Sequence, residues 1–333
     1  MGTTIAPEKI LKELSDLWVD SGKQGQAEGG TGVLRACSMT LLVLAEAGED
    51  TQDLGETIAA LMPEHPARAI VVRMSGPGER SLTERVYSQC WMPFGQRKQI
   101  CCEQVEILVS DAALADLPSV VLPLAVPDLP LILWCRSPRL AAMPEFLPIA
   151  AMAQKVVVDS GAMKDPVAAL KLTAALSARG VLLGDLSWTR LTRWREMLAQ
   201  VFENQQNLAQ LQEISGVEVE HGDGYRVSAL YMAMWLTDCL ADAGVLDASF
   251  GVGRAPEGVS LRVKLVDHGF ALELARRQDR MVVTVNGVSQ CTSLSQPTDY
   301  LLMREELGIV RRDPVFQRAL TRAAALALPS EAK

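Results

Sequence analysis

The chain alternates short apolar segments, each long enough for one β-strand, with segments that carry helical signals. The apolar segments are rich in aliphatic and β-branched residues and fall at residues 36–44, 69–74, 131–135 and 155–159. Asp50 and Pro63 bracket a helix over residues 51–61, because Asp favours the N-cap and Pro ends a helix. Parallel strands need long, usually helical, connections. The alternation therefore predicts an α/β fold whose N-terminal half is a mixed or parallel Rossmann-like sheet with flanking helices.

An amphipathic helix is expected to begin at Pro7. Apolar residues recur with the spacing of one helical face, at positions 10, 11, 14, 17 and 18. We expect this helix to end at Ser21-Gly22, with a glycine-rich loop over residues 22–32. Two further strands are expected at residues 83–91 and 99–109, where apolar and polar residues partly alternate.

The sequence pattern changes after Gln205. Apolar and polar residues alternate in four segments, at residues 259–266, 270–275, 281–286 and 288–294. Short turns join them, and Asn286-Gly287 is typical of a tight hairpin, so we expect an antiparallel meander in a smaller C-terminal α+β domain. The predicted division is an N-terminal α/β domain over 1–162 and a C-terminal region over 163–333. In that region a helical connector, 163–206, precedes the meander domain, 207–333.

Charge and cysteine usage exclude several partners and compartments. Acidic residues outnumber basic residues by 40 to 32, for a net charge of −8, so we expect no nucleic acid partner. Seven cysteines, an odd number spread through apolar segments, are typical of reduced thiols in a cytoplasmic protein. No basic region followed by an apolar core begins the sequence, so we expect no secretory signal. Residues 117–135 are apolar but contain four prolines and Asp128, so we expect no membrane partner.

No familiar catalytic, cofactor or metal motif occurs in the sequence. Two of the three histidines fall in expected turns, without a thiol or carboxylate at metal-ligand spacing. Gly251-Val252-Gly253 lacks the third glycine of a dinucleotide motif, and Gly29-Gly30-Thr31-Gly32 lacks the lysine of a P-loop. No Gly-x-Ser-x-Gly nucleophile motif is found. We therefore predict no catalytic residues, no cofactor and no metal.

A tryptophan–arginine segment stands out as a candidate partner-binding surface. Its members, all within eight residues, are Trp188, Arg190, Arg193, Trp194 and Arg195. Tryptophan and arginine dominate interface hot spots and arginine binds phosphate, so the segment is a contact surface or a ligand clamp. The alternative is core tryptophans with solvated arginines on the other helix face. On one continuous helix, Arg190, Arg193 and Trp194 would share a face.

Trp134 and Arg136 are further candidates, because they fall at the carboxyl end of an expected strand. Ligands of open α/β sheets bind at that edge, so Arg136 is expected to contact an anion or to pair with an acid of the sheet itself. Cys101 and Cys102 are adjacent, so on a strand their side chains are expected to point to opposite faces. One thiol could then be exposed and have a redox role, or both thiols could be packed against the protein.

Several strings, in the same order and spread over nearly the whole chain, resemble one protein family. They include HPARAIVV at 65–72, QICCEQVEI at 99–107, LPSVVLPL at 117–124, VPDLP at 126–130, GDLSWTRL at 184–191, REEL at 304–307 and DPVF at 313–316. Together they resemble the glucose-6-phosphate dehydrogenase assembly protein (OpcA) family.

The resemblance implies a non-enzymatic partner protein. Such a protein binds glucose-6-phosphate dehydrogenase and favours its active oligomer as an allosteric activator, which supports the oxidative pentose phosphate pathway. The resemblance supplies no ligand-binding residues. The alternative function is an enzyme or sensor that binds a sugar phosphate or nucleotide on the Rossmann-like sheet, with Arg136 and the arginines near Trp188 as its anion contacts.

Overall fold

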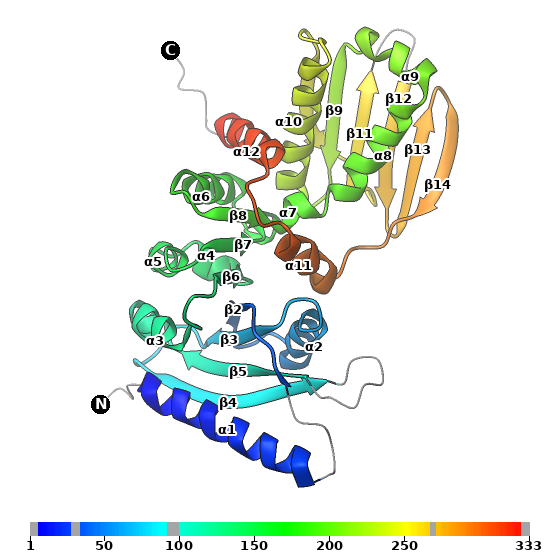
Figure 1. The fold of residues 1–333 in the computed structure, drawn as a ribbon. Coiled ribbons are helices and arrows are strands. Elements are labelled where there is room, and N and C mark those ends of the chain that lie inside the picture. Colours follow the sequence, from blue (N-terminus) through cyan, green and yellow to red (C-terminus); the bar gives the residue numbers. More distant parts are fainter. Residues whose placement is uncertain (1–5, 28–33, 92–99, 267–270, 328–333) are drawn as a thin grey trace. The chain divides into compact units, whose positions relative to one another are not determined.

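The computed structural model describes residues 6–27, 34–91, 100–266 and 271–327, which form two compact units (Figure 1). The first unit comprises Met1–Val158 with Gly180–Leu183, and the second comprises Asp159–Arg179 with Gly184–Lys333. One β-sheet lies mainly in each unit. The domain boundary predicted after residue 162 stays a prediction.

The sheet of the first unit is mixed, as the alternation of strands and helices predicts. Its order is β1-β5-β3-β2-β6-β7-β8, with β4 antiparallel to β5 and parallel pairing from β5 through β7. The strands are β1 (Leu34–Arg35), β2 (Met39–Glu46), β3 (Ala67–Met74), β4 (Leu82–Trp91), β5 (Ile100–Val109), β6 (Leu131–Cys135), β7 (Lys155–Val158) and β8 (Leu182–Asp185). Every strand predicted in this half is present, although the first begins at Met39 rather than at residue 36.

Helices flank this sheet, and the connections between its parallel strands cross it in two opposite directions. They are α1 (Pro7–Ala27), α2 (Thr51–Leu61), α3 (Leu117–Leu124), α4 (Pro138–Ala141) and α5 (Phe146–Ala150), with the 3₁₀ helix η2 (Asp111–Asp116). α2 links β2 to β3, whereas α3 lies in the connection that returns from β5 to β6. Because such crossovers are right-handed, the two directions place helices on opposite faces, and the strand order reverses between β2 and β6.

The start of α2 follows its sequence signal, whereas the end of α1 does not. The Asp50 carboxylate accepts hydrogen bonds from the backbone N–H groups of Gln52 and Asp53, as predicted for an N-cap. The predicted end of α1 at Ser21-Gly22 is wrong, because the helix continues to Ala27. Each of the two glycines inside the helix, Gly22 and Gly25, costs only about 1 kcal/mol relative to alanine, and the neighbouring lysine, glutamine and alanine residues are good helix formers. Residues 28–32 of the predicted loop lie outside the described residues.

β3 is buried along its whole length even though it contains two arginines. Arg68 and Arg73 pair with Glu103 and Glu106 of the neighbouring strand β5. Arg68 also donates a hydrogen bond to the carbonyl oxygen of Leu124 at the end of α3 (2.7 Å). These pairs compensate for the removal of four charged groups from water.

The second unit combines one antiparallel meander with several helices. Its helices are α6 (Pro166–Ala178), α7 (Leu186–Thr189), α8 (Thr192–Glu203), α9 (Gln205–Ala209), α10 (Arg226–Asp242), α11 (Asp299–Gly308) and α12 (Pro314–Ala327), with η3 (Ser160–Ala162) and η4 (Leu211–Glu213). α12 packs against both α6 and α10. Asp165 and Asp313 cap α6 and α12, because each carboxylate accepts a backbone N–H in the first turn. Among the described residues, no helix is both long and apolar enough to cross a lipid bilayer.

The sheet of the second unit has the order β10-β9-β11-β12-β13-β14. Its strands are β9 (Gly216–His221), β10 (Ser249–Arg254), β11 (Leu261–Val266), β12 (Ala271–Arg277), β13 (Arg280–Val285) and β14 (Val288–Ser293). β11 to β14 confirm the predicted meander, and Asn286 and Gly287 adopt φ of 49° and 81°, as their tight hairpin requires. β10 is not predicted, because glycines interrupt its apolar pattern; it pairs in parallel with β9.

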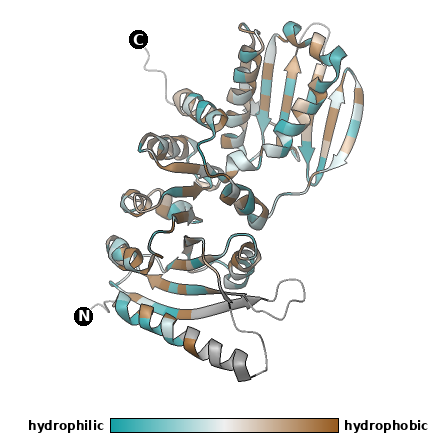
Figure 2. Ribbon diagram, viewed as in Figure 1, coloured by the Kyte–Doolittle hydropathy of each residue, from teal (hydrophilic) through white to brown (hydrophobic). Residues whose placement is uncertain are grey.

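The two faces of this sheet differ in chemistry, and Figure 2 shows the strands banded by hydropathy. Val219, Val263 and Leu274 align across β9, β11 and β12 and are fully buried. α10 packs against β9 and β10. The opposite face carries ion pairs such as Lys264 with Glu220 (3.4 Å). Antiparallel sheets commonly have one face packed against the hydrophobic core and one face exposed to solvent.

Removal of one member of the buried Arg68–Glu103 pair is expected to destabilise the fold. We predict that Arg68→Ala lowers the free energy of unfolding by about 3–5 kcal/mol, because Glu103 loses its buried counter-charge. Arg80→Ala is the matched control, since Arg80 pairs with Asp116 but has a side chain that is 61% exposed, and its loss should be below about 1 kcal/mol. Urea unfolding followed by circular dichroism measures both values, and equal losses would contradict the prediction.

Candidate functional site

Trp134 and Arg136 lie at the carboxyl edge of the first sheet, and both are engaged within the unit. Trp134 is 1% exposed. Arg136 donates a hydrogen bond from Nε to Glu49 Oε2 (2.7 Å), and its guanidinium lies 4.8 Å from the centre of the Trp134 ring. Of the two alternatives left open for Arg136, the structure shows pairing with an acid at the sheet edge.

Further carboxylates occupy the same edge. Arg139 contacts Glu46 at the end of β2 (3.1 Å) and Asp111 after β5 (2.7 Å). Asp50 caps α2, at the helix start where a dinucleotide fold receives its phosphates. A phosphate at this edge would therefore meet carboxylates, and Arg136 and Arg139 already have carboxylate partners.

The tryptophan–arginine segment forms two helices, α7 and α8, with Arg190 and Leu191 between them. Both tryptophans are buried, each with 4% exposure. The Trp188 ring contacts Tyr231 of α10 and Phe316 of α12, with ring centres 6.0 and 5.5 Å apart. Its indole N–H donates a hydrogen bond to Asp313 Oδ2 (3.3 Å). Trp188 therefore anchors the segment among the helices of the second unit.

The three arginines of the segment have different surroundings. Arg190 makes a bidentate pair with Asp159 (2.8 and 2.6 Å). Arg195 stacks over Trp188, with its guanidinium 3.8 Å from the ring centre, and burial lowers the pKa of Arg195 to about 10. The Arg193 side chain is 75% exposed and contacts Glu196 on its own helix (3.1 Å). Of the three, Arg193 therefore projects from the unit and the other two are bound within it.

Asp185 is a buried carboxylate that the sequence analysis does not single out. It lies where β8 meets α7 and is 0% exposed. Its Oδ1 accepts hydrogen bonds from the backbone N–H groups of Ser187 (2.9 Å) and Ser160 (3.2 Å), and its Oδ2 accepts one from the Tyr231 hydroxyl (2.7 Å). Burial raises the pKa of Asp185 to about 6, although these hydrogen bonds act in the opposite direction.

A second buried carboxylate, Glu306 of α11, lies directly against β8. It is 2% exposed and accepts a hydrogen bond from the Thr189 hydroxyl (2.5 Å). A Cβ atom at Gly184 would overlap the Glu306 carboxyl group. Any residue larger than glycine at this position would therefore require the Glu306 carboxyl group to move.

The described part of the chain offers neither a group of metal ligands nor a thiol of lowered pKa. No group of three or more histidine, cysteine or acidic side chains there could hold a metal ion. Burial raises the pKa of the Cys102 thiol to about 11, which keeps it protonated and weakly reactive. The side chain of Cys101 lies outside the described residues, so its redox role stays a prediction.

The buried carboxyl of Asp185 should give the fold a specific pH dependence. The pKa of Asp185 is about 6 in the folded protein, against 3.8 for an ordinary aspartate. Its favourable contribution to the free energy of unfolding is therefore complete below about pH 4 and is lost as the pH rises through about 6. We predict that the parent becomes less stable relative to Asp185→Asn by about 3 kcal/mol between about pH 4 and pH 7. Denaturant unfolding of both proteins across this range measures the difference.

A second variant tests the same cause. Tyr231→Phe removes one hydrogen bond to the charged form of Asp185, so the transition should move to higher pH. A difference between parent and Asp185→Asn that is flat or rises with pH would overturn this account of Asp185.

Comparison with solved structures finds distant similarity to dehydrogenases. A dehydrogenase from Chromobacterium violaceum aligns with a TM-score of 0.47 and 12% identity, over 88% of this chain and 94% of that one. The scyllo-inositol dehydrogenase of Lactobacillus casei aligns with a TM-score of 0.45 and 12% identity, over 88% and 96% of the two chains.

Sequence relatives include proteins named OxPP cycle protein OpcA. The one from Nostoc punctiforme is 31% identical over 141 residues, which are 42% of this chain and 30% of the relative. The one from Synechocystis sp. is 25% identical over 190 residues, 56% of this chain and 39% of the relative. The chain thus spans less than half the length of the curated relatives it matches.

Two OpcA family models match the chain in succession. The first, which describes the N-terminal domain of a glucose-6-phosphate dehydrogenase subunit, matches residues 58–175. The second, which describes the C-terminal domain of such a subunit, matches residues 182–320. Because the two models together match well over half of its residues, in the order of the family, the chain belongs to the OpcA family.

Proposed function

We propose that this chain is a non-catalytic partner of glucose-6-phosphate dehydrogenase that favours the active oligomer of that enzyme. The observation that carries the proposal is the pair of family models, both of which describe a subunit of glucose-6-phosphate dehydrogenase. The names of the relatives point to the same pathway, the oxidative pentose phosphate cycle. The chain would then support that pathway without a reaction of its own.

The carboxyl edge of the first sheet supports a partner role over a phosphate-binding enzyme on that sheet. Arg136 and Arg139, two cations at this edge, are paired with Glu49, Glu46 and Asp111. If these arginines bound a phosphate instead, the carboxylates would lose their counter-charges and would lie close to a second anion, which is unfavourable.

We propose Arg193 as the residue of the tryptophan–arginine segment that touches the dehydrogenase. Its exposed guanidinium is available to an acidic patch at the cost of one surface ion pair with Glu196. The other residues of the segment would affect binding to the dehydrogenase only indirectly, because their contacts fix the position of α8. They are Trp188, Trp194, Arg190 and Arg195. Trp134 and Arg136 would support the first unit in the same indirect way.

An activator of this kind must bind the active oligomer more tightly than the other forms of the enzyme. The activator can shift the equilibrium between these forms by no more than the difference between its binding free energies for the active oligomer and for the other forms. A tenfold preference corresponds to about 1.4 kcal/mol, which a few exposed contacts can supply.

Titration of the purified chain into glucose-6-phosphate dehydrogenase from the same organism tests the proposal. We expect the sedimentation coefficient of the enzyme to rise and its KM to fall or its maximal rate to increase, in proportion to the complex formed. Bovine serum albumin at equal concentration is the control for nonspecific protection. If neither sedimentation nor rate changes at micromolar protein, the proposed function is wrong.

Arg193→Ala should weaken binding to the dehydrogenase without changing the melting temperature. We expect a loss of less than about 1 kcal/mol in binding free energy, larger at low salt, because Arg193 is an exposed charge. Arg311→Ala, which removes an exposed arginine outside the segment, is the matched control and should bind like the parent. If the two variants bind equally at every salt concentration, the contact surface lies elsewhere.

A further inference from the structure

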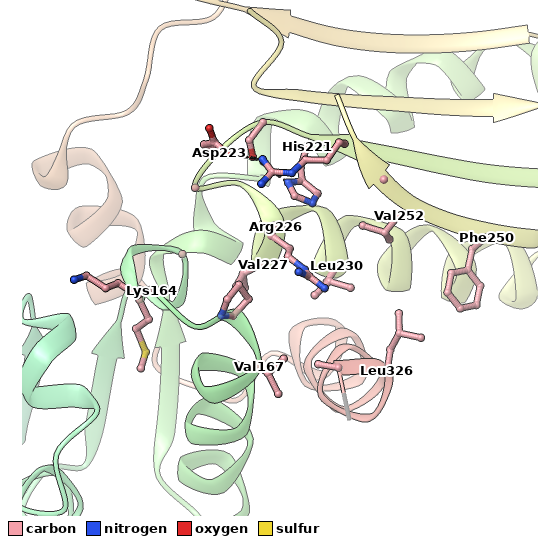
Figure 3. A pocket seen from close by; sticks show the side chains of 18 residues that line it. Lys164, Val167, His221, Asp223, Arg226, Val227, Leu230, Phe250, Val252 and Leu326 are labelled. Atoms are coloured by element: carbon pink, nitrogen blue, oxygen red, sulfur yellow. Dashed lines mark hydrogen bonds and ion pairs between the residues drawn. The ribbon is translucent and has the colours of Figure 1, made fainter. Parts of the chain in front are cut away.

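A pocket of 700 Å³ lies in the second unit, beside the ends of two parallel strands (Figure 3). β9, α10 and β10 form a parallel strand–helix–strand unit, in which β9 ends at His221 and β10 ends at Arg254. Both terminal residues line the pocket, as do Arg226 and Val227 in the first turn of α10. The pocket therefore occupies the place where strand–helix–strand units bind ligands, although the sequence predicts no such unit here.

The turn between β9 and α10 requires its two glycines. A Cβ atom at Gly222 would lie 2.7 Å from the carbonyl oxygen of Val259, and Gly224 adopts a φ of +77°. No side chain caps the start of α10, whose N-cap residue is Tyr225. The first N–H groups of a long helix therefore lack a capping acceptor and, together with the helix dipole, favour an anion.

Cationic side chains without acidic partners line the same pocket. Neither Lys164 nor Arg226 makes an ion pair with any described residue, whereas Arg254 pairs with Asp223. The pocket wall thus carries an excess of positive charge in a chain with a net charge of −8. Uncompensated cations gathered in a concave site favour a multiply charged anion.

His221 supplies a second, independent indication of a ligand. Its side chain is buried, with the residue only 8% exposed, yet it lines the pocket. Nδ1 lies 2.9 Å from the carbonyl oxygen of Gly222, and this contact orients the ring. Nε2 makes no hydrogen bond within the described part of the chain, so this ring nitrogen of a pocket-lining side chain remains available to a ligand.

The remainder of the wall is apolar and includes one aromatic ring. Val167, Leu230 and Leu326 contribute aliphatic surface, and Phe250 is 41% exposed. Figure 3 shows Lys164 and Phe250 at opposite ends of the pocket, with Arg226 between them. An anionic group and a planar apolar group could therefore bind at the same time, at different ends.

We propose that this pocket binds a nucleotide-class organic phosphate. The phosphate lies against Arg226, Lys164 and the start of α10, with His221 Nε2 as a further polar contact, and the base stacks on Phe250. A cavity of this volume is within the usual range for small-molecule sites. The proposal is independent of the proposed function, because it concerns the chain alone.

Isothermal titration of the full chain with ADP tests the proposal, with adenosine and inorganic phosphate as separate arms. We expect saturable binding of ADP, and binding of each fragment at least about tenfold weaker, because each fills only one end of the pocket. No ADP binding up to about 1 mM would overturn the proposal.

Variants locate the binding site. Arg226→Gln and Lys164→Gln should each weaken ADP about tenfold, as expected for loss of a charged hydrogen bond. Arg311→Gln and Lys171→Gln, which neutralise exposed cations that do not line the pocket, should leave ADP binding unchanged. Phe250→Ala should weaken ADP but not inorganic phosphate. Equal ADP binding by the pocket and control variants would place the ligand elsewhere, and phosphate binding as tight as that of ADP would exclude the nucleotide class.

Discussion

Asp185, a buried carboxyl group, links three elements of the second unit. Its oxygens accept hydrogen bonds from the N–H groups of Ser187 and Ser160 and from the Tyr231 hydroxyl, which belong to α7, η3 and α10. Such a group is tolerated without water only when its hydrogen bonds are satisfied, so these elements must stay in place together. The position of Trp188, and through it the position of α8, follows from this arrangement.

Much of the fold could be predicted from local patterns. The strands predicted for the first sheet, the meander and the cap at Asp50 depend on residues close together in the sequence, and these predictions are confirmed. The end of α1 and the strand β10 could not be predicted in this way. In both elements, glycines predict a break that does not occur. In α1, neighbouring helix formers outweigh the small penalty of each glycine, and in β10 the pairing with β9 does so.

The candidate site was less predictable, because the partners that decide each residue's role are distant in the sequence. The composition of the tryptophan–arginine segment is visible at once, but nothing local indicates that Arg190 meets Asp159, 31 residues earlier, while Arg193 stays exposed. The pocket beside α10 had one available signal, a Gly-x-Gly turn directly after a strand and before a helix. Its significance depends on β10, which completes the parallel unit and which the sequence did not reveal.

The contact between Gly184 and Glu306 has a consequence for how this chain can change during evolution. Any side chain at Gly184 would overlap the Glu306 carboxyl group, which also binds Thr189. A larger residue at Gly184 requires Glu306 to move or to be replaced by a smaller residue, so the effects of substitutions at the two positions should not be additive. The two positions lie 122 residues apart in the sequence, and the residue present at one is expected to influence which residues are accepted at the other.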